Sequence, residues 1–258
     1  TTTGPINIYG TSTANALYGT AIWVGTNAFD ANGDGNVTTV GSVANGYSTA
    51  IVSDSGAILL DGRMTTTRTD GWSHSLVFLS RVYDRSLIQT NTGNITLKGY
   101  ANTPKGDSTG AVFQMEGGSS GFSFLSNTGD IYLQAFQEAR STATYNNAIR
   151  FGPSAMANSI RFGAATDTST YTGRLTIEGD SILNADSGVT GSIKAYGTNA
   201  VSFSSSSASS TKDFTLGTMW DLGTQHSSIS IGKLTESKNV NLEADLFAVG
   251  PHRKEVCL

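Results

Sequence analysis

One short phrase recurs along this chain: an apolar residue, any residue, a second apolar residue, any residue, and a small residue. Clear copies begin at Ile6, Ile58, Ile95, Phe113, Ile131, Leu175 and Ile193, and looser copies at Ile22, Leu76, Ile149, Phe214, Ile229 and Leu246. The apolar residues alternate with period two, which is typical of a short β-strand with one buried face. Gly, Asn, Asp, Ser and Thr bound the copies and favour turns. The pattern therefore predicts many similar strands separated by turns.

The spacing between copies is almost constant. Between Ile58 and Ile149, successive copies begin 18, 19, 18, 18 and 18 residues apart. A β-sandwich is the alternative, but its turns recur about every 8–12 residues and do not repeat one motif in register. Strands at one longer interval can instead stack in parallel, each turn of the chain rising by about 4.8 Å. The sequence thus predicts an all-β fold, a right-handed parallel β-helix (β-solenoid) with about 18 residues per rung.

The pattern also bears on handedness and extent. A left-handed hexapeptide helix needs an aliphatic residue at every sixth position, and Ala101 and Asp107 stand six and twelve residues after Ile95. The right-handed form is therefore expected. A single β-helix domain is expected over residues 1–250, with residues 251–258 as a terminal tail or boundary, because that segment breaks the repeat. One inward ladder is expected to contain Ile58, Ile95, Ile131, Leu175 and Ile193, beside a second that contains Leu60, Leu97, Leu133, Ile177 and Ala195.

Several copies follow a Ser-Gly or Thr-Gly pair, at Ser55-Gly56, Thr92-Gly93, Thr128-Gly129 and Thr172-Gly173. The pattern Thr-Gly-x-Ile-x-Leu-x-Gly, with a return rich in Ser, Thr, Asn and Gly, resembles the coils of filamentous-haemagglutinin-type adhesins. Those proteins are long right-handed β-helices exported by a two-partner pathway. The resemblance covers roughly residues 4–250, and it is specific for architecture rather than function. It implies a shaft or tip segment of a secreted or surface-exposed bacterial protein.

Composition excludes two classes of function. Charged residues make up only 14% of the chain and the formal net charge is -4, so the chain offers no basic face to nucleic acid. No run of 18 apolar residues is present, so no membrane-spanning segment is expected. The single cysteine, Cys257, cannot form an internal disulfide.

The segment Asp30-Ala-Asn32-Gly-Asp34-Gly35-Asn36-Val37 resembles the first eight positions of an EF-hand or dockerin loop. Asp30, Asn32 and Asp34 supply oxygen atoms at positions 1, 3 and 5, and Asn36 supplies a backbone carbonyl at position 7. At position 12, however, Gly41 replaces the bidentate Glu. The two interpretations are a weak calcium site, formed by Asp30, Asn32, Asp34 and Asn36, and a plain Asx-Gly turn.

Four side chains are candidates for contact with a ligand. Trp23 and Tyr132 each lie between two inward residues, so alternation points both outward. An outward aromatic ring can stack on a sugar, or it can pack under a loop. Arg150 and Arg161 occupy the same place in two copies of Ile-Arg-Phe-Gly. These arginines can bind an anionic sugar, or they can be solvated or paired with carboxylates.

The sequence shows no coherent catalytic group. The position before the small residue holds Tyr9, Asp61, Lys98, Glu116, Gln134, Glu178 and Tyr196. Glu116 and Glu178 are expected at least three rungs apart, about 14 Å, whereas glycosidase carboxylate pairs are about 5–9.5 Å apart. His74 and His226 have no Cys, Asp or Glu at metal-ligand spacing and are expected in turns or on the surface. No enzyme activity is therefore expected.

These observations favour an extracellular structural or adhesive segment of a bacterial surface or secreted protein. Its expected partners are a host-cell or matrix glycan or protein, or further copies of the chain joined end to end. Two alternatives stay open: a carbohydrate-active β-helix enzyme or phage tailspike, and a self-assembling filament subunit. An acidic cluster in one groove would favour the enzyme, and uncapped apolar ends would favour the filament.

Overall fold

The computed structural model describes residues 3–13, 18–25, 49–65, 72–80, 85–102, 107–115, 121–137, 148–151, 160–166, 169–179, 182–184, 193–204, 214–216, 220–222, 226–232, 240–242 and 256–257. The regular elements within these ranges are all β-strands. The described residues include no helix that is long and apolar enough to cross a membrane. The predicted all-β class is confirmed.

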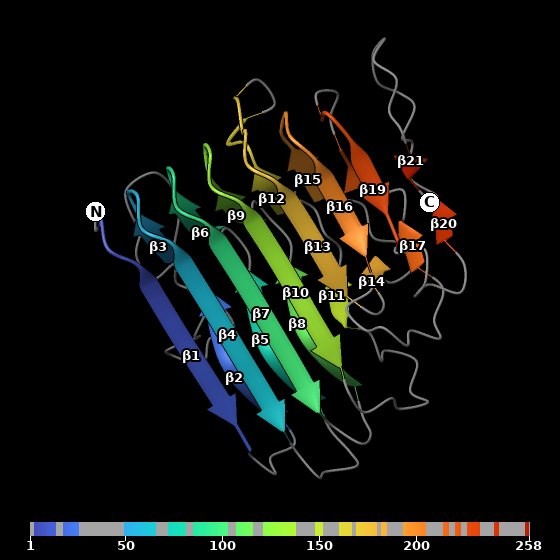
Figure 1. Cartoon of the computed structure of the whole chain (residues 1–258). Coiled ribbons are helices and arrows are strands. Elements are labelled where there is room, and N and C mark those ends of the chain that lie inside the picture. Colours follow the sequence, from blue (N-terminus) through green and yellow to red (C-terminus); the bar gives the residue numbers. More distant parts are fainter. Residues whose placement is uncertain are drawn as a thin grey trace, which may run out of the picture.

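The largest sheet has eight strands, and every pairing in it is parallel. Its strands, in spatial order, are β1 (Ile6–Ser12), β4 (Ile58–Thr65), β7 (Ile95–Asn102), β10 (Ile131–Gln137), β13 (Leu175–Gly179), β16 (Val201–Ser204), β19 (Ile229–Ile231) and β21 (Val256–Cys257). This sheet forms the front layer of the molecule in Figure 1. The last strand, β21, lies within the segment that the sequence predicts as a tail, and it pairs with β19.

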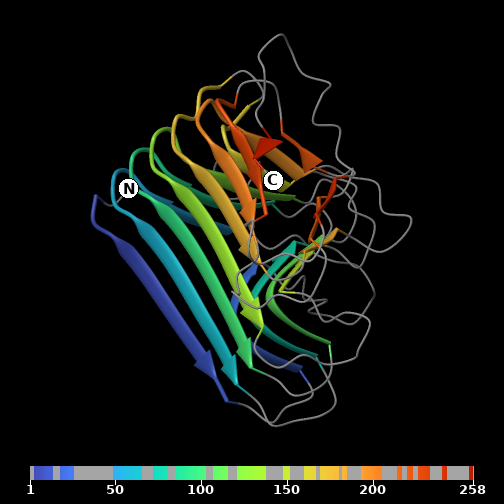
Figure 2. The ribbon, with the colours of Figure 1, turned by 45° about the vertical axis from the view of Figure 1, so that its right-hand side comes forward.

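Two further parallel sheets form the opposite side of the molecule, as the turned view in Figure 2 shows. The six-stranded sheet contains β3 (Thr49–Ser53), β6 (Arg85–Thr90), β9 (Gly121–Leu125), β12 (Ile160–Gly163), β15 (Ile193–Tyr196) and β18 (Trp220–Asp221). The five-stranded sheet contains β2 (Tyr18–Gly25), β5 (Trp72–Ser80), β8 (Asp107–Met115), β11 (Ile149–Phe151) and β14 (Ile182–Asn184). A separate parallel pair is formed by β17 (Phe214–Leu216) and β20 (Val240–Leu242).

Each of the first five coils, which begin with β1, β4, β7, β10 and β13, contributes one strand to each of the three large sheets. The chain passes from β4 through β5 and β6 to β7, and β7 pairs with β4 in register. It runs down the front sheet, returns behind it and advances away from β1, which is a right-handed coil (Figure 1). The fold is therefore a parallel β-solenoid, as the sequence predicts.

The structure corrects the predicted rung length. Ile58 pairs with Ile95, which is 37 positions later in the chain, and Ile95 pairs with Ile131, which is 36 positions later. The intermediate copy of the phrase, at Leu76, lies in β5 of the five-stranded sheet. The 18-residue repeat is therefore half a coil, because successive copies of the phrase form strands in different sheets.

The predicted core ladders are largely confirmed. Ile58, Ile95, Ile131 and Leu175 pair in register, and each is at most 1% exposed. The prediction that Ile193 and Ala195 continue these ladders is wrong, since both lie in β15 of the six-stranded sheet. Only 26 positions separate Leu175 from its partner Val201. A step of 18 residues does not complete even this shorter coil, and from Leu175 it reaches the six-stranded sheet.

Close backbone contact explains why the recurring phrase ends in a small residue. A Cβ atom added to Gly62 would lie 2.4 Å from the carbonyl oxygen of Ser75. Similarly, a Cβ atom on Gly10 would lie 2.3 Å from the carbonyl oxygen of Ala21. Both oxygen atoms belong to the five-stranded sheet. The backbones of the two sheets approach closely at this point, so larger side chains do not fit.

A repeated hydrogen bond closes the corner that leads into the eight-stranded sheet. In three successive coils, a buried hydroxyl oxygen accepts a hydrogen bond from the amide of a glycine three residues later. The pairs are Ser53 with Gly56, Thr90 with Gly93 and Ser126 with Gly129, at 3.0, 3.1 and 3.0 Å. These local turns satisfy the backbone where it leaves the sheet ladder. The Ser-Gly and Thr-Gly pairs of the sequence are thus corner signals.

Candidate functional site

The outer face of the eight-stranded sheet carries two rows of side chains that run along the solenoid axis. Because the strands pair in register, outward residues of neighbouring coils become direct neighbours. The polar row contains Tyr9, Asp61, Lys98, Gln134 and Glu178. The aromatic row contains Arg63, Tyr100 and Phe136.

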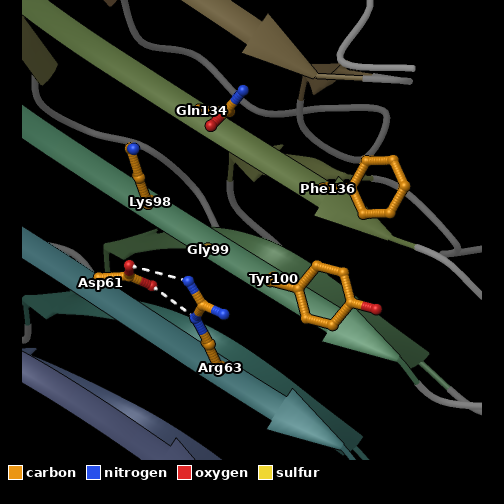
Figure 3. Close-up of a pocket in the computed structure, with 7 residues that line it drawn as sticks. All are labelled: Asp61, Arg63, Lys98, Gly99, Tyr100, Gln134 and Phe136. Carbon is orange, nitrogen blue, oxygen red and sulfur yellow. Dashed lines mark hydrogen bonds and ion pairs between the residues drawn. The ribbon is translucent and has the colours of Figure 1, made fainter. Parts of the chain in front are cut away.

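A hollow of about 310 Å³ lies between the two rows. It is lined by Asp61, Arg63, Lys98, Gly99, Tyr100, Gln134 and Phe136, which come from β4, β7 and β10 (Figure 3). Its volume is near the lower end of the roughly 300–1,000 Å³ of small-molecule sites. We therefore take it as the candidate binding site.

The rings of Tyr100 and Phe136 form an aromatic platform at one side of the hollow. Their centroids are 5.6 Å apart and their planes differ by 9°. Figure 3 shows the rings side by side on the sheet, with their faces turned towards the viewer. The face of an aromatic ring is the negative part of its quadrupole, and it attracts polarised C–H groups. The platform suits a flat ligand that presents C–H groups.

Charged side chains line the rest of the hollow. Arg63 binds Asp61 with two hydrogen bonds, of 3.3 and 3.4 Å, within the same strand. The hydrogen bond to Asp61 and its charge raise the pKa of the Arg63 guanidinium above its ordinary value. Lys98 lies on the next strand, level with Asp61, and forms no ion pair within the described part of the chain. Lys98 is therefore available to an anionic ligand.

A hydrogen-bond network fixes the far end of the polar row. One carboxylate oxygen of Glu178 accepts hydrogen bonds from the Tyr132 hydroxyl and from Nε2 of Gln134, the latter at 3.0 Å. Partial burial and the bond to Glu178 raise the pKa of the Tyr132 hydroxyl, so it stays protonated as a donor. These contacts hold Gln134 at the edge of the hollow.

Both aromatic candidates from the sequence lie where alternation places them. Trp23 is 47% exposed in β2, at the edge of the five-stranded sheet. Tyr132 is half-buried on the outer face of β10 and contacts Glu178. The two rings lie on different sheets, so they do not form one site.

The two arginine candidates have different environments. Arg150 is only 2% exposed in β11, which removes it from the surface where a ligand was expected. Alternation predicts an outward side chain, but this row of the five-stranded sheet is covered away from its edge. Val77, in the same row, is 3% exposed, whereas Trp23 at the edge is 47% exposed. Arg161 is half-buried in β12, and its guanidinium carbon lies 5.4 Å from the centre of the Tyr196 ring.

The candidate calcium ligands Asp30, Asn32, Asp34 and Asn36 lie outside the described residues. Among the residues that are described, no group of three or more His, Cys, Asp or Glu side chains could hold a metal ion. His226 lies outside the strands, between β18 and β19, but it is buried, so the expected surface position is wrong. Its ring nitrogens lie 2.9 and 2.6 Å from the carbonyl oxygens of Asn199 and Ala195, so it ties neighbouring coils together.

Sequence reasoning named Asp61, Lys98 and Gln134 as outward residues but missed the hollow. The missing signal was the register between coils. One coil is aligned with the next by an offset of 37 residues between β4 and β7 and of 36 residues between β7 and β10. With these offsets, Arg63, Tyr100 and Phe136 lie beside one another. No family model matches the chain, and comparisons with curated proteins and with solved structures also gave no match. Interpretation of the site therefore depends on its geometry alone.

Proposed function

We propose that this chain is a non-catalytic structural and adhesive segment of a secreted or surface-exposed bacterial β-solenoid protein, and that its partner is a host-cell or matrix glycan or protein. The observation that carries the proposal is the hollow between the polar and aromatic rows on the outer face of the eight-stranded sheet. The resemblance of the coils to adhesin repeats supports the extracellular setting.

The chemistry of the hollow favours binding over catalysis. Among the described residues that line it, the one carboxylate is Asp61, which is paired with Arg63. The next carboxylate in the polar row, Glu178, is three strands away, about 14 Å at strand spacing. Glycosidase carboxylate pairs are about 5–9.5 Å apart. Rigid strands that display aromatic and polar groups suit non-covalent recognition.

The test is a pair of assays on the purified chain. A glycan array and an assay of binding to cells and matrix proteins should show retention, whereas a depolymerisation assay on the same polysaccharides should show no release of reducing ends. Turnover that is lost on replacing one carboxylate would instead favour a carbohydrate-active enzyme or tailspike. Absence of binding to every cell, matrix and glycan surface would contradict an adhesive function.

One observation favours a second candidate, a filament subunit joined end to end. Strands β1, β2 and β3 each form one end of their sheet in the described topology, and all three belong to the first coil. The apolar side chain of Ile8 in β1 is 36% exposed there. Unpaired strand edges can template association. Sedimentation velocity over a range of concentrations tests this: Ile8→Lys should reduce association, and a chain that stays monomeric throughout contradicts it.

A further inference from the structure

We propose that the hollow binds a pyranose unit that carries a carboxylate, with the sugar ring on Tyr100 and Phe136 and the carboxylate at Lys98. This inference rests on the proposed function, because it names the class of ligand that the same binding face takes.

The aromatic platform specifies the sugar ring. The half-buried Tyr100 and Phe136 come from adjacent strands, and their nearly parallel rings turn their faces outward (Figure 3). A pyranose has one face of axial C–H groups, which is complementary to the negative face of an aromatic ring. Both rings are held on rigid paired strands, so little conformational entropy is lost when a ligand binds.

The charges of the hollow specify the carboxylate. Asp61 offsets the charge of Arg63 through their ion pair. Among the described residues that line the hollow, the positive charge that remains is that of Lys98. Lys98 follows Asp61 in the polar row and precedes the uncharged Gln134. An anionic group at this position gains a charge-assisted hydrogen bond from the ammonium group. Asp61 and Gln134, on either side, can exchange hydrogen bonds with the hydroxyl groups of the same sugar.

The shape of the hollow specifies a single sugar unit within a longer chain. A volume of about 310 Å³ is near the lower limit of small-molecule sites. The polar row extends past the hollow to Tyr9 on one side and to Glu178 on the other. A glycan that lies along the solenoid axis can therefore place one acidic unit in the hollow and continue over the neighbouring coils.

The experiment measures binding of methyl β-glucuronide and methyl β-glucoside to the full chain by titration calorimetry. The two ligands differ at C6, where the glucuronide has a carboxylate. A ligand of about 14 non-hydrogen atoms is expected to bind with a Kd on the order of 1 mM. We expect the glucuronide to bind about tenfold more tightly than the glucoside, because it alone pairs with Lys98. The preference should shrink in high salt.

Variants assign the two contacts. Lys98→Met should weaken glucuronide binding about tenfold and leave glucoside binding unchanged. Tyr100→Ala should weaken both ligands by roughly fivefold, because it removes part of the platform. The matched control is Lys194→Met, which removes a half-buried lysine from β15 in the six-stranded sheet and should change neither affinity. Circular dichroism melts establish that each variant folds.

The inference is overturned if the wild-type chain binds neither ligand, if it binds both equally, if Lys98→Met keeps the preference, or if Lys194→Met abolishes it. Its failure is distinguishable from failure of the proposed function. Undiminished retention of Lys98→Met and Tyr100→Ala on cells, matrix and glycan arrays would reject the hollow and leave adhesion standing. Binding of the glucuronide without retention on any of those surfaces would support the hollow and reject adhesion.

Discussion

Glycines stack at the corner that leads into the eight-stranded sheet, one above another in successive coils. A Cβ atom on Gly93 would lie 2.2 Å from the carbonyl oxygen of Gly56, and one on Gly129 would lie 1.8 Å from that of Gly93. Both distances are far shorter than an ordinary van der Waals contact, and the atoms concerned are backbone atoms. The corner therefore admits only glycine, because neither coil can move without breaking its ladder.

Gly93→Ala should destabilise the protein by about 2–4 kcal/mol, since the added methyl group forces two stacked backbones apart. Chemical denaturation followed by circular dichroism measures the change. Gly4→Ala is the matched control, because no atom lies within 4 Å of a Cβ atom at that position. Equal effects of the two substitutions would show that stacking at the corner is not the cause.

His74 should make stability depend on pH. Burial and, to a smaller extent, the charge of Arg150 lower the pKa of His74 to about 4. The unfolded chain binds a proton at this residue near pH 6.5, whereas the folded chain stays neutral until about pH 4. The unfolded state therefore holds more protons between these values, and the free energy of unfolding falls as the pH is lowered through that window.

The expected loss from His74 between pH 6.5 and 4 is about 1–3 kcal/mol, reduced by the partial exposure of the residue. Denaturation curves at several pH values test this. His74→Gln has no titrating ring, so its stability should vary less over the same window. A wild-type curve as flat as that of the variant would contradict the assigned pKa.

At the level of strands, the ladder through Ile131 buries apolar side chains between successive coils. Ile131 is fully buried between Ile95 and Leu175, its partners in the coils before and after. Ile131→Ala should cost about 2–5 kcal/mol, because the cavity has packed residues on both sides. The side chain of Ile8, at the end of the sheet, is already 36% exposed, so Ile8→Ala should lower the stability by less than about 1 kcal/mol. Thermal unfolding of both variants measures the difference.

The strands could be read from the sequence because period-two alternation is a local signal. Ile58, Ile95, Ile131 and Leu175 were correctly stacked from it. No local signal gives the length of a coil, because the phrase recurs in two different sheets within one coil. For that reason Ile193 was assigned to the wrong sheet. The burial of Arg150 was also missed, because alternation does not show which outward faces are covered.

The candidate site was only partly predictable for the same reason. Alternation identified Asp61, Lys98 and Gln134 as outward residues. The contact between Tyr100 and Phe136, however, depends on pairing residues 36 positions apart. Only the register of whole coils brings their rings together.

At the scale of the molecule, each coil of the eight-stranded sheet pairs only with the coils before and after it. The free energy of unfolding of such a fold is approximately the sum of the contributions within each coil and those of the interfaces between adjacent coils. The longest strands of this sheet that have a neighbour on both sides are β4, β7 and β10, which have eight, eight and seven residues. Later strands shorten to four residues in β16 and three in β19, while β1 has one neighbour in the sheet as far as the chain is described.

Amide hydrogen exchange should therefore be slowest in β4, β7 and β10 and faster in β1 and β19, because opening at an end breaks fewer contacts. Exchange followed by peptide mass spectrometry gives the protection of each strand. Ile131→Ala should speed exchange most in β7, β10 and β13, which share its ladder, and least in β1. Uniform acceleration along the sheet would instead show that the solenoid unfolds as one cooperative unit, which would contradict this gradient.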